Sequence, residues 1–167
     1  MYKIKKTKLK GVYKIQSYKF SDFRGAFVET YNLKMFNKNV RKIKFIQDDI
    51  SVSKKNVLRG IHGDNKTWKL LSCVHGKIYF VVLNNDAKSK QYGKWQSFIM
   101  SDNDYDQILV PPKFGNAYLV LSDKAVFSYK QSTYYRKSTQ FSISWKDPRF
   151  KIKWPIKKPI LSKRDSF

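Results

Sequence analysis

The chain has 167 residues, a length at which a single domain buries a core without metal ions or disulfides. Its formal net charge is +23, from 29 lysines and 6 arginines against 11 aspartates and one glutamate. The lysines are dispersed along the chain instead of forming an arginine-rich face, which argues against a specific nucleic-acid reader.

Cysteine content and hydropathy bound the compartment. Cys73 is the only cysteine, so no internal disulfide can form, and we expect a reducing compartment, the cytoplasm. No apolar segment typical of a signal peptide follows Met1. No apolar run approaches the roughly 20 residues of a membrane-spanning helix, so we expect no membrane partner.

Short runs rich in aromatic and β-branched residues recur along the chain and predict strands. In chain order these runs are residues 12–15, 26–31, 44–46, 70–74, 77–83, 95–100, 107–110, 117–121, 125–130 and 141–145. Only residues 33–38 predict a helix. Strands at about ten-residue spacing predict an all-β antiparallel sandwich or barrel, a single domain over residues 1–167. The proline-containing stretch 154–159 cannot be a central strand, so we expect it to wrap around the barrel.

His62 lies between Arg59 and Lys69 in a chain with only two histidines. Cations on both sides of an imidazole suit an anionic substrate and a reaction in which the histidine removes a proton. Asp165 would orient the imidazole ring if the fold brought the two together, although the residues alone favour an aspartate in a frayed tail.

A metal site would need several histidines and a glutamate in one place, a set that the sequence lacks. No glycine-rich phosphate loop or dinucleotide fingerprint is present either. We therefore expect no metal and no cofactor, and we expect His75 to be structural.

A series of motifs runs from Asp22 to Asp165. They are DFRGAFVE (22–29), FIQDDISVS (45–53), VLRGIH (57–62), WKL (68–70), Ser89 with YGKW (92–95), YK (129–130) with YY (134–135), WKDP (145–148), IKWP (152–155) and LSKRD (161–165). In this order they resemble the nucleotide-sugar 3,5-epimerases typified by dTDP-4-dehydrorhamnose 3,5-epimerase. The resemblance implies a cupin-type antiparallel jelly-roll barrel with minor short helices, and a homodimer in which a strand crosses between subunits.

The resemblance also implies an activity: epimerisation at C3 and/or C5 of a nucleotide-linked 4-keto-6-deoxy sugar, in surface-polysaccharide sugar biosynthesis. In that family a base removes a proton beside the ketone, an enolate forms, and an acid returns a proton to the opposite face. By resemblance, His62 is the base and Asp165 its partner. Lys69 stabilises the enolate oxygen, and Tyr129 is the proton donor.

A set of substrate-binding residues is implied in the same way. They are Arg24, Phe27, Glu29, Gln47, Arg59, Asn116 and Tyr135. Guanidinium forks fit phosphate oxygens, which suits the two arginines. The aromatic members and the glutamate match positions that hold the nucleotide base, although core packing is an equal explanation for the two aromatic rings.

Three segments depart from the family pattern. His62 is followed by Gly63-Asp64-Asn65 instead of an aromatic residue and a glutamine, Asn116 replaces a histidine, and Asp49 replaces an asparagine. We therefore expect retained proton chemistry on an altered substrate, such as a GDP-linked sugar or a 6-deoxyheptose. Two alternatives remain: a nucleotide-sugar 3,4-ketoisomerase, and a non-catalytic basic jelly-roll module that binds polyanions.

Overall fold

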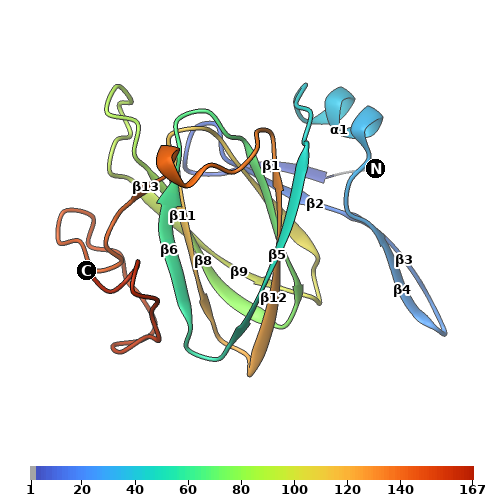
Figure 1. Cartoon of the computed structure of the whole chain (residues 1–167). Helices are drawn as coiled ribbons and strands as arrows, with labels where there is room; N and C mark the ends of the chain where they lie inside the picture. Colours follow the sequence, from blue (N-terminus) through green and yellow to red (C-terminus); the bar gives the residue numbers. More distant parts are fainter. Residues whose placement is uncertain (1–2) are drawn as a thin grey trace.

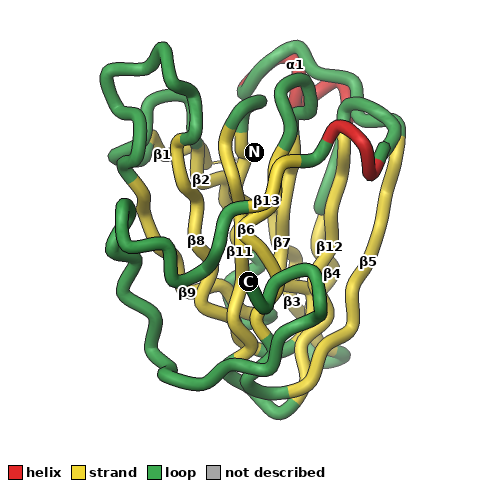
Figure 2. Tube along the Cα trace, turned by 60° about the vertical axis from the view of Figure 1, so that its left-hand side comes forward, coloured by secondary structure: helices red, strands yellow, loops and turns green. Residues whose placement is uncertain are grey.

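A computed structural model describes residues 3–167, which fold into two antiparallel sheets that face each other (Figures 1 and 2). One sheet has the strand order β1-β2-β10-β7-β12-β5 and the other β13-β6-β11-β8-β9. The bounds are β1 Lys3–Lys6, β2 Tyr13–Gln16, β5 Gln47–Lys54, β6 Leu58–Gly63, β7 Lys69–His75, β8 Lys77–Asn84, β9 Trp95–Ser101, β10 Asp106–Val110, β11 Phe114–Val120, β12 Lys124–Gln131 and β13 Phe141–Ser142. The predicted all-β antiparallel architecture is confirmed.

The main core lies between the two sheets. Phe80 on β8, Tyr118 on β11 and Phe127 on β12 are each at most 1% exposed. The Tyr118 and Phe127 ring centroids lie 4.7 Å apart, so side chains from the two sheets interdigitate. Burying an aromatic side chain of this size contributes about 1.5–3 kcal/mol, which makes these rings a main source of stability.

The one α-helix among residues 3–167, α1 (Leu33–Asn39), confirms the predicted helix at 33–38. Asn32 caps its first turn, because the side-chain oxygen accepts a hydrogen bond from the Met35 amide at 3.2 Å. Phe36 is its only buried residue and packs against Tyr31 and Phe45 in a second apolar cluster. The same cluster includes Ile15 of β2, Leu70 of β7 and Leu109 of β10, so the helix lies on the outer face of the six-stranded sheet and not between the sheets.

Residues 144–167, here named the C-terminal strap, run along the outside of the five-stranded sheet (Figure 1). The Trp95 indole donates to the Phe150 carbonyl at 2.9 Å, and the Tyr79 hydroxyl donates to the Lys153 carbonyl at 2.8 Å. The Leu58 amide donates to the Ile160 carbonyl at 3.0 Å. The wrapping segment predicted from its prolines is therefore present, and its course brings residues 162–165 back to the sheet.

The strand predicted at 44–46 was wrong, and the one predicted at 141–145 was too long, since β13 covers only Phe141–Ser142. Residues 44–46 and 143–145 carry no strand, whereas β1, β5, β6 and the first strand of a hairpin were not predicted. β5 was missed because its pattern is inverted: Ile50 and Val52 are exposed, while Ser51 and Ser53 are the more buried residues. Polar side chains of β5 point inward because they line a cavity. A pattern analysis based on hydrophobic residues therefore assigns this inward face to the solvent-exposed surface.

The hairpin that was not predicted pairs β3 (Tyr18–Asp22) with β4 (Gly25–Glu29) and projects away from the sheets (Figure 1). Its aromatic side chains are exposed, with Phe23 at 99% and Phe27 at 73%.

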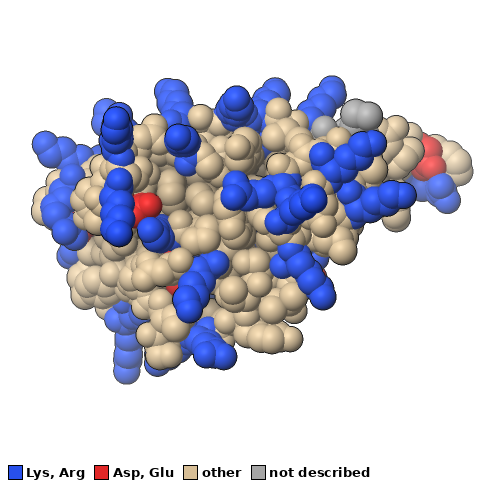
Figure 3. Space-filling model, turned by 90° about the horizontal axis from the view of Figure 1, so that it is seen from above, with Lys and Arg blue, Asp and Glu red and all other residues tan. Residues whose placement is uncertain are grey.

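Among residues 3–167, no helix has the length and apolarity needed to cross a membrane. Lys and Arg side chains are scattered over the face seen in Figure 3.

Candidate active site

A cavity of about 430 Å³ opens between the two sheets, a size that suits a small organic ligand. Side chains from β5, β6, β7, β11, β12, the segment between β12 and β13, and the C-terminal strap line it. They are Gln47, Asp49, Ser51, Arg59, His62, Lys69, Asn116, Tyr129, Gln131, Tyr135, Gln140, Ser162, Arg164 and Asp165. The cavity thus brings together all four residues expected to be catalytic and four of the seven expected to bind substrate.

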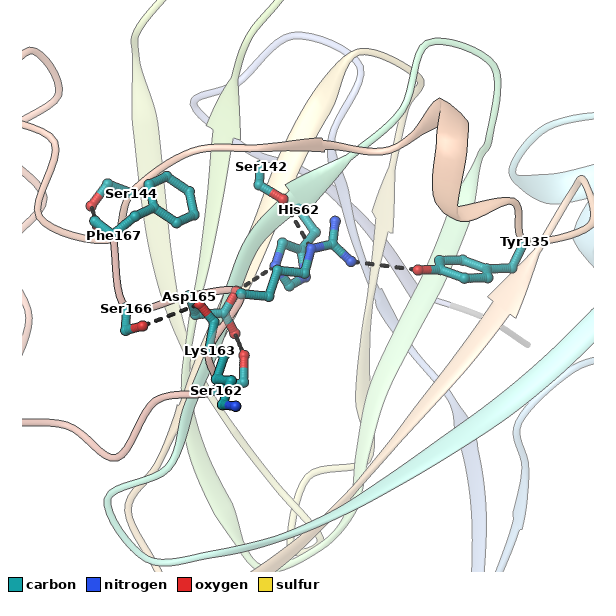
Figure 4. A network of polar contacts seen from close by, with 10 residues as sticks. His62, Tyr135, Ser142, Ser144, Ser162, Lys163, Asp165, Ser166 and Phe167 are labelled. Carbon is teal, nitrogen blue, oxygen red and sulfur yellow. Dashed lines mark hydrogen bonds and ion pairs between the residues drawn. The ribbon is translucent and has the colours of Figure 1, made fainter.

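His62 on β6 pairs with Asp165 on the C-terminal strap, 103 positions away (Figure 4). His62 Nε2 lies 2.6 Å from Asp165 Oδ1, and the Ser162 hydroxyl donates to the other carboxylate oxygen at 3.0 Å. Burial would raise the pKa of Asp165, but the hydrogen bonds from His62 and Ser162 outweigh it and hold this pKa below its usual range. An ionised carboxylate only accepts, so Nε2 carries the hydrogen and Nδ1 keeps the lone pair that a base needs.

Lys69 opens β7 and is only 7% exposed, yet it lines the cavity. Burial lowers the pKa of Lys69, and the carboxylate of Asp64 partly opposes that shift. Asp64 is fixed by the amides of Lys66 and Thr67, at 2.8 and 2.7 Å, and by the Gln140 side chain at 3.0 Å. Asp64, which belongs to the segment after His62 that differs from the family pattern, thus supplies a buried negative charge near Lys69.

Tyr129 reaches the cavity from the sheet opposite His62. It lies on β12 of the six-stranded sheet, whereas His62 lies on β6 of the five-stranded sheet. Burial raises the pKa of Tyr129, while a hydrogen bond with Ser51 and the charge of Arg59 oppose the rise. A neutral phenol and an imidazole therefore approach a bound ligand from different walls.

A polar network forms another part of the lining. The Gln47 amide donates to Asp49 at 2.9 Å, and the Gln131 amide donates to the same carboxylate at 2.7 Å. Gln47 also accepts a hydrogen bond from the Tyr135 backbone amide at 2.7 Å. Asp49 is thus an acceptor held in place in a cavity whose other charged groups include Arg59.

Asn116 lies beside His62, because the two residues pair in the register of β11 and β6. Its side chain is 7% exposed, and Oδ1 has no hydrogen-bond partner among the described residues. Gly63 lies beneath the ring of Phe141, which an added Cβ would overlap. The small residue after His62 is therefore a packing requirement at this end of β6.

Three of the expected binding residues lie on the hairpin, outside the cavity. Arg24 pairs with Asp22 at 2.6 Å, Phe27 is exposed, and Glu29 accepts a hydrogen bond from Asn32 at 3.2 Å. Arg24 and Phe27 line a separate hollow of about 540 Å³ on the hairpin. Within this one chain, the structure does not bring them to His62.

Several lining residues were not predicted. Arg164 donates to the Ser142 hydroxyl at 3.0 Å and to the Tyr135 hydroxyl at 3.4 Å. The position of Arg164 next to Asp165 was the only sequence signal for it, and no sequence signal pointed to Gln131 or Gln140.

In the described part of the chain, no three His, Cys, Asp or Glu side chains group closely enough to hold a metal ion.

Comparisons with known proteins agree with this geometry. The family model for dTDP-4-dehydrorhamnose 3,5-epimerase matches residues 6–167. The chain is 37% identical over 164 residues to the dTDP-4-dehydrorhamnose 3,5-epimerase of Shigella flexneri, spanning 96% of this chain and 91% of that one. It is 30% identical over 161 residues to a dTDP-4-dehydrorhamnose 3-epimerase of Streptomyces niveus, spanning 94% and 78% respectively.

A solved structure adds the fold. The dTDP-6-deoxy-D-glucose-3,5-epimerase of Legionella pneumophila, in complex with dTDP-4-keto-L-rhamnose, superposes with a TM-score of 0.94 at 31% identity, covering 99% of this chain and 90% of that one. The predicted cupin-type fold and isomerase class are confirmed. The chain belongs to the dTDP-4-dehydrorhamnose 3,5-epimerase family.

Proposed function

We propose that the chain epimerises C3, alone or together with C5, of a dTDP-linked 4-keto-6-deoxy sugar. The observation that carries this proposal is the His62–Asp165 pair on one wall of the cavity with Tyr129 on the opposite wall. C3 is the preferred carbon because the relatives named above are 3,5-epimerases and a 3-epimerase. Such sugars are precursors of surface polysaccharides, the context we assign.

In the proposed reaction, His62 removes the proton beside the ketone, and the C–H electrons move onto the ketone oxygen to form an enolate. The buried ammonium of Lys69 stabilises that oxygen, since fixed charge in a poorly hydrated site needs no reorganisation. Tyr129 then gives its O–H proton to the opposite face of the carbon, and the carbonyl re-forms. Imidazolium and phenolate return to their starting states by exchange with water.

Binding in this proposal uses the cations and amides of the lining. Arg59 and Arg164 attract the diphosphate, whereas Gln47 and Asn116 hydrogen-bond the sugar and Tyr135 contacts the base. The fixed acceptor Asp49 favours a hydroxyl donor on the sugar, since a carboxylate accepts only.

The hairpin residues Arg24, Phe27 and Glu29 complete the site of a second copy in a homodimer. Support comes from the projecting hairpin, its exposed aromatics and the distance of these residues from their own cavity. We expect Arg24→Ala and His62→Asn each to be inactive. Refolding the two together should restore about a quarter of parental activity, because half of randomly assorted dimers hold one intact site of two. A mixture as inactive as its components would contradict the shared site.

The function is tested by incubating the purified chain in D₂O with dTDP-4-keto-6-deoxyglucose and, separately, with GDP-linked and heptose analogues. NMR should show deuterium at C3 and an inverted product for the dTDP-linked sugar. A better rate with a GDP-linked sugar or a heptose would move the assignment to that substrate. A ketone shifted to C3 would indicate a ketoisomerase, and no exchange with any sugar would overturn the proposal.

A further inference from the structure

Four side-chain hydroxyls form a continuous chain from the cavity into the core. The Tyr129 hydroxyl lies 3.4 Å from Ser51 Oγ, which lies 2.7 Å from the Tyr118 hydroxyl. The Tyr118 hydroxyl lies 3.0 Å from Ser53 Oγ, and Arg59 Nε donates to Ser53 Oγ at 3.0 Å. We name Ser51, Tyr118 and Ser53 the hydroxyl chain. Tyr118 is 1% exposed and Ser53 is 6% exposed, so water reaches little of it.

Arg59, at the buried end of the hydroxyl chain, can only donate hydrogen bonds. A guanidinium has no acceptor and does not deprotonate, so Arg59 fixes Ser53 Oγ as an acceptor. Each hydroxyl carries one hydrogen and can accept two bonds, so Ser53 can still donate to Tyr118. The direction that suits an acid at Tyr129 is then Ser53 to Tyr118, Tyr118 to Ser51 and Ser51 to Tyr129. Tyr129 then has an accepted bond behind it, and its own hydrogen is free to point into the cavity.

We propose that Arg59 and the hydroxyl chain are positioning residues that aim the Tyr129 proton at the substrate carbon. This inference rests on the proposed role of Tyr129 as the acid. When the proton leaves Tyr129 and the C–H bond forms, the electron pair of the O–H bond stays on the phenolate. Ser51 already donates to that oxygen, so the new charge meets an oriented dipole and no group has to turn. The Ser51 link of 3.4 Å is the longest, and charge on the phenolate favours its shortening.

The hydroxyl chain orients the Tyr129 hydroxyl but does not deliver protons to it, because the guanidinium at the far end cannot supply one. The phenolate therefore recovers its hydrogen from water in the cavity. Arg59 also links two functions: Nε holds Ser53, which leaves its terminal nitrogens for the diphosphate. A bound diphosphate thus steadies the residue that orients the acid.

A purely structural role is a definite alternative, since the Tyr118 ring packs in the core against Phe127. The two roles differ in what Tyr118→Phe changes. This variant keeps the ring and removes only the central hydroxyl, so Ser51 loses its fixed direction. Damage to packing would slow proton removal and inversion together, whereas loss of orientation would slow inversion alone.

The test measures deuterium exchange and net inversion separately, for the parent and for Tyr118→Phe. The matched control is Tyr79→Phe, which loses a hydroxyl bonded to the Lys153 carbonyl outside the cavity. We expect inversion to fall about 10- to 100-fold in Tyr118→Phe, part of what an acid contributes, while exchange stays within about threefold of the parent. The control should keep the parental ratio of exchange to inversion.

An unchanged ratio in Tyr118→Phe would overturn the proposal while leaving the epimerase intact. If Tyr118→Phe does not fold, Ser53→Ala breaks the same chain one link further from Tyr129 and must raise the same ratio. A parent protein that exchanges no deuterium would instead refute the proposed function. The two failures are therefore distinguishable.

Discussion

Replacing Asp165 by Asn removes the negative charge beside the proposed base, His62, and keeps the shape of the Asp165 side chain. The imidazolium that forms on proton removal lies against the Asp165 carboxylate, with His62 Nε2 2.6 Å from Oδ1. For charge centres about 4 Å apart at an effective dielectric of about 20, their attraction is about 4 kcal/mol. Each 1.36 kcal/mol is about tenfold in rate, so the upper limit is nearly 10³-fold.

The His62 side chain is 24% exposed, which screens part of that attraction, so we expect exchange to fall about 10²- to 10³-fold in Asp165→Asn. An amide that donates to Nε2 would also place the hydrogen on Nδ1 and block the base. The assay is deuterium exchange at C3 followed by NMR. Asp106→Asn is the matched control, because Asp106 is equally buried and paired with Lys14 outside the cavity. Exchange within tenfold of the parent would refute the role of Asp165 as support for the base.

Two further substitutions separate stability from chemistry. Lys69→Met removes a cation whose pKa is lowered by burial, so at pH 7 the folded state no longer holds a poorly solvated charge. Calorimetry should find an unchanged or higher Tm, with exchange reduced about 10²-fold or more; a lower Tm with full exchange would contradict this. Tyr129→Phe should let deuterium exchange outlast net inversion, both measured by NMR. Inversion at the parental rate would leave Tyr129 as a packing residue.

Much of the barrel was predictable, because most of its strands present apolar residues to the core. β8 and β12 were found on that basis, since Phe80 and Phe127 belong to runs of aromatic and β-branched residues. β5 was missed for the opposite reason, since its inward side chains serve the cavity instead of the core. A strand whose inward-facing side chains are mostly polar, as in β5, is thus the kind that hydrophobic periodicity detects least.

The candidate site was predictable only through motifs. Composition and spacing drew attention to His62, but without the resemblance they favoured a place in a frayed tail for Asp165. Their pairing depends on the path of the C-terminal strap, which is fixed by contacts such as Trp95 with Phe150 that no local pattern encodes. The hydroxyl chain was invisible for the same reason, since Tyr118 reads as one more core aromatic.

The C-terminal strap has a consequence for how this protein loses activity under denaturing conditions. It carries Asp165 but has no regular strand, and it docks through a few hydrogen bonds and an apolar patch that includes Phe150 and Trp154. Segments held in this way open locally at a smaller free-energy cost than sheet strands do. Mild urea should therefore release the strap, and with it the partner of His62, before the sheets separate. Inactivation would then precede the loss of circular dichroism, so enzymatic half-life would report strap docking and not barrel stability.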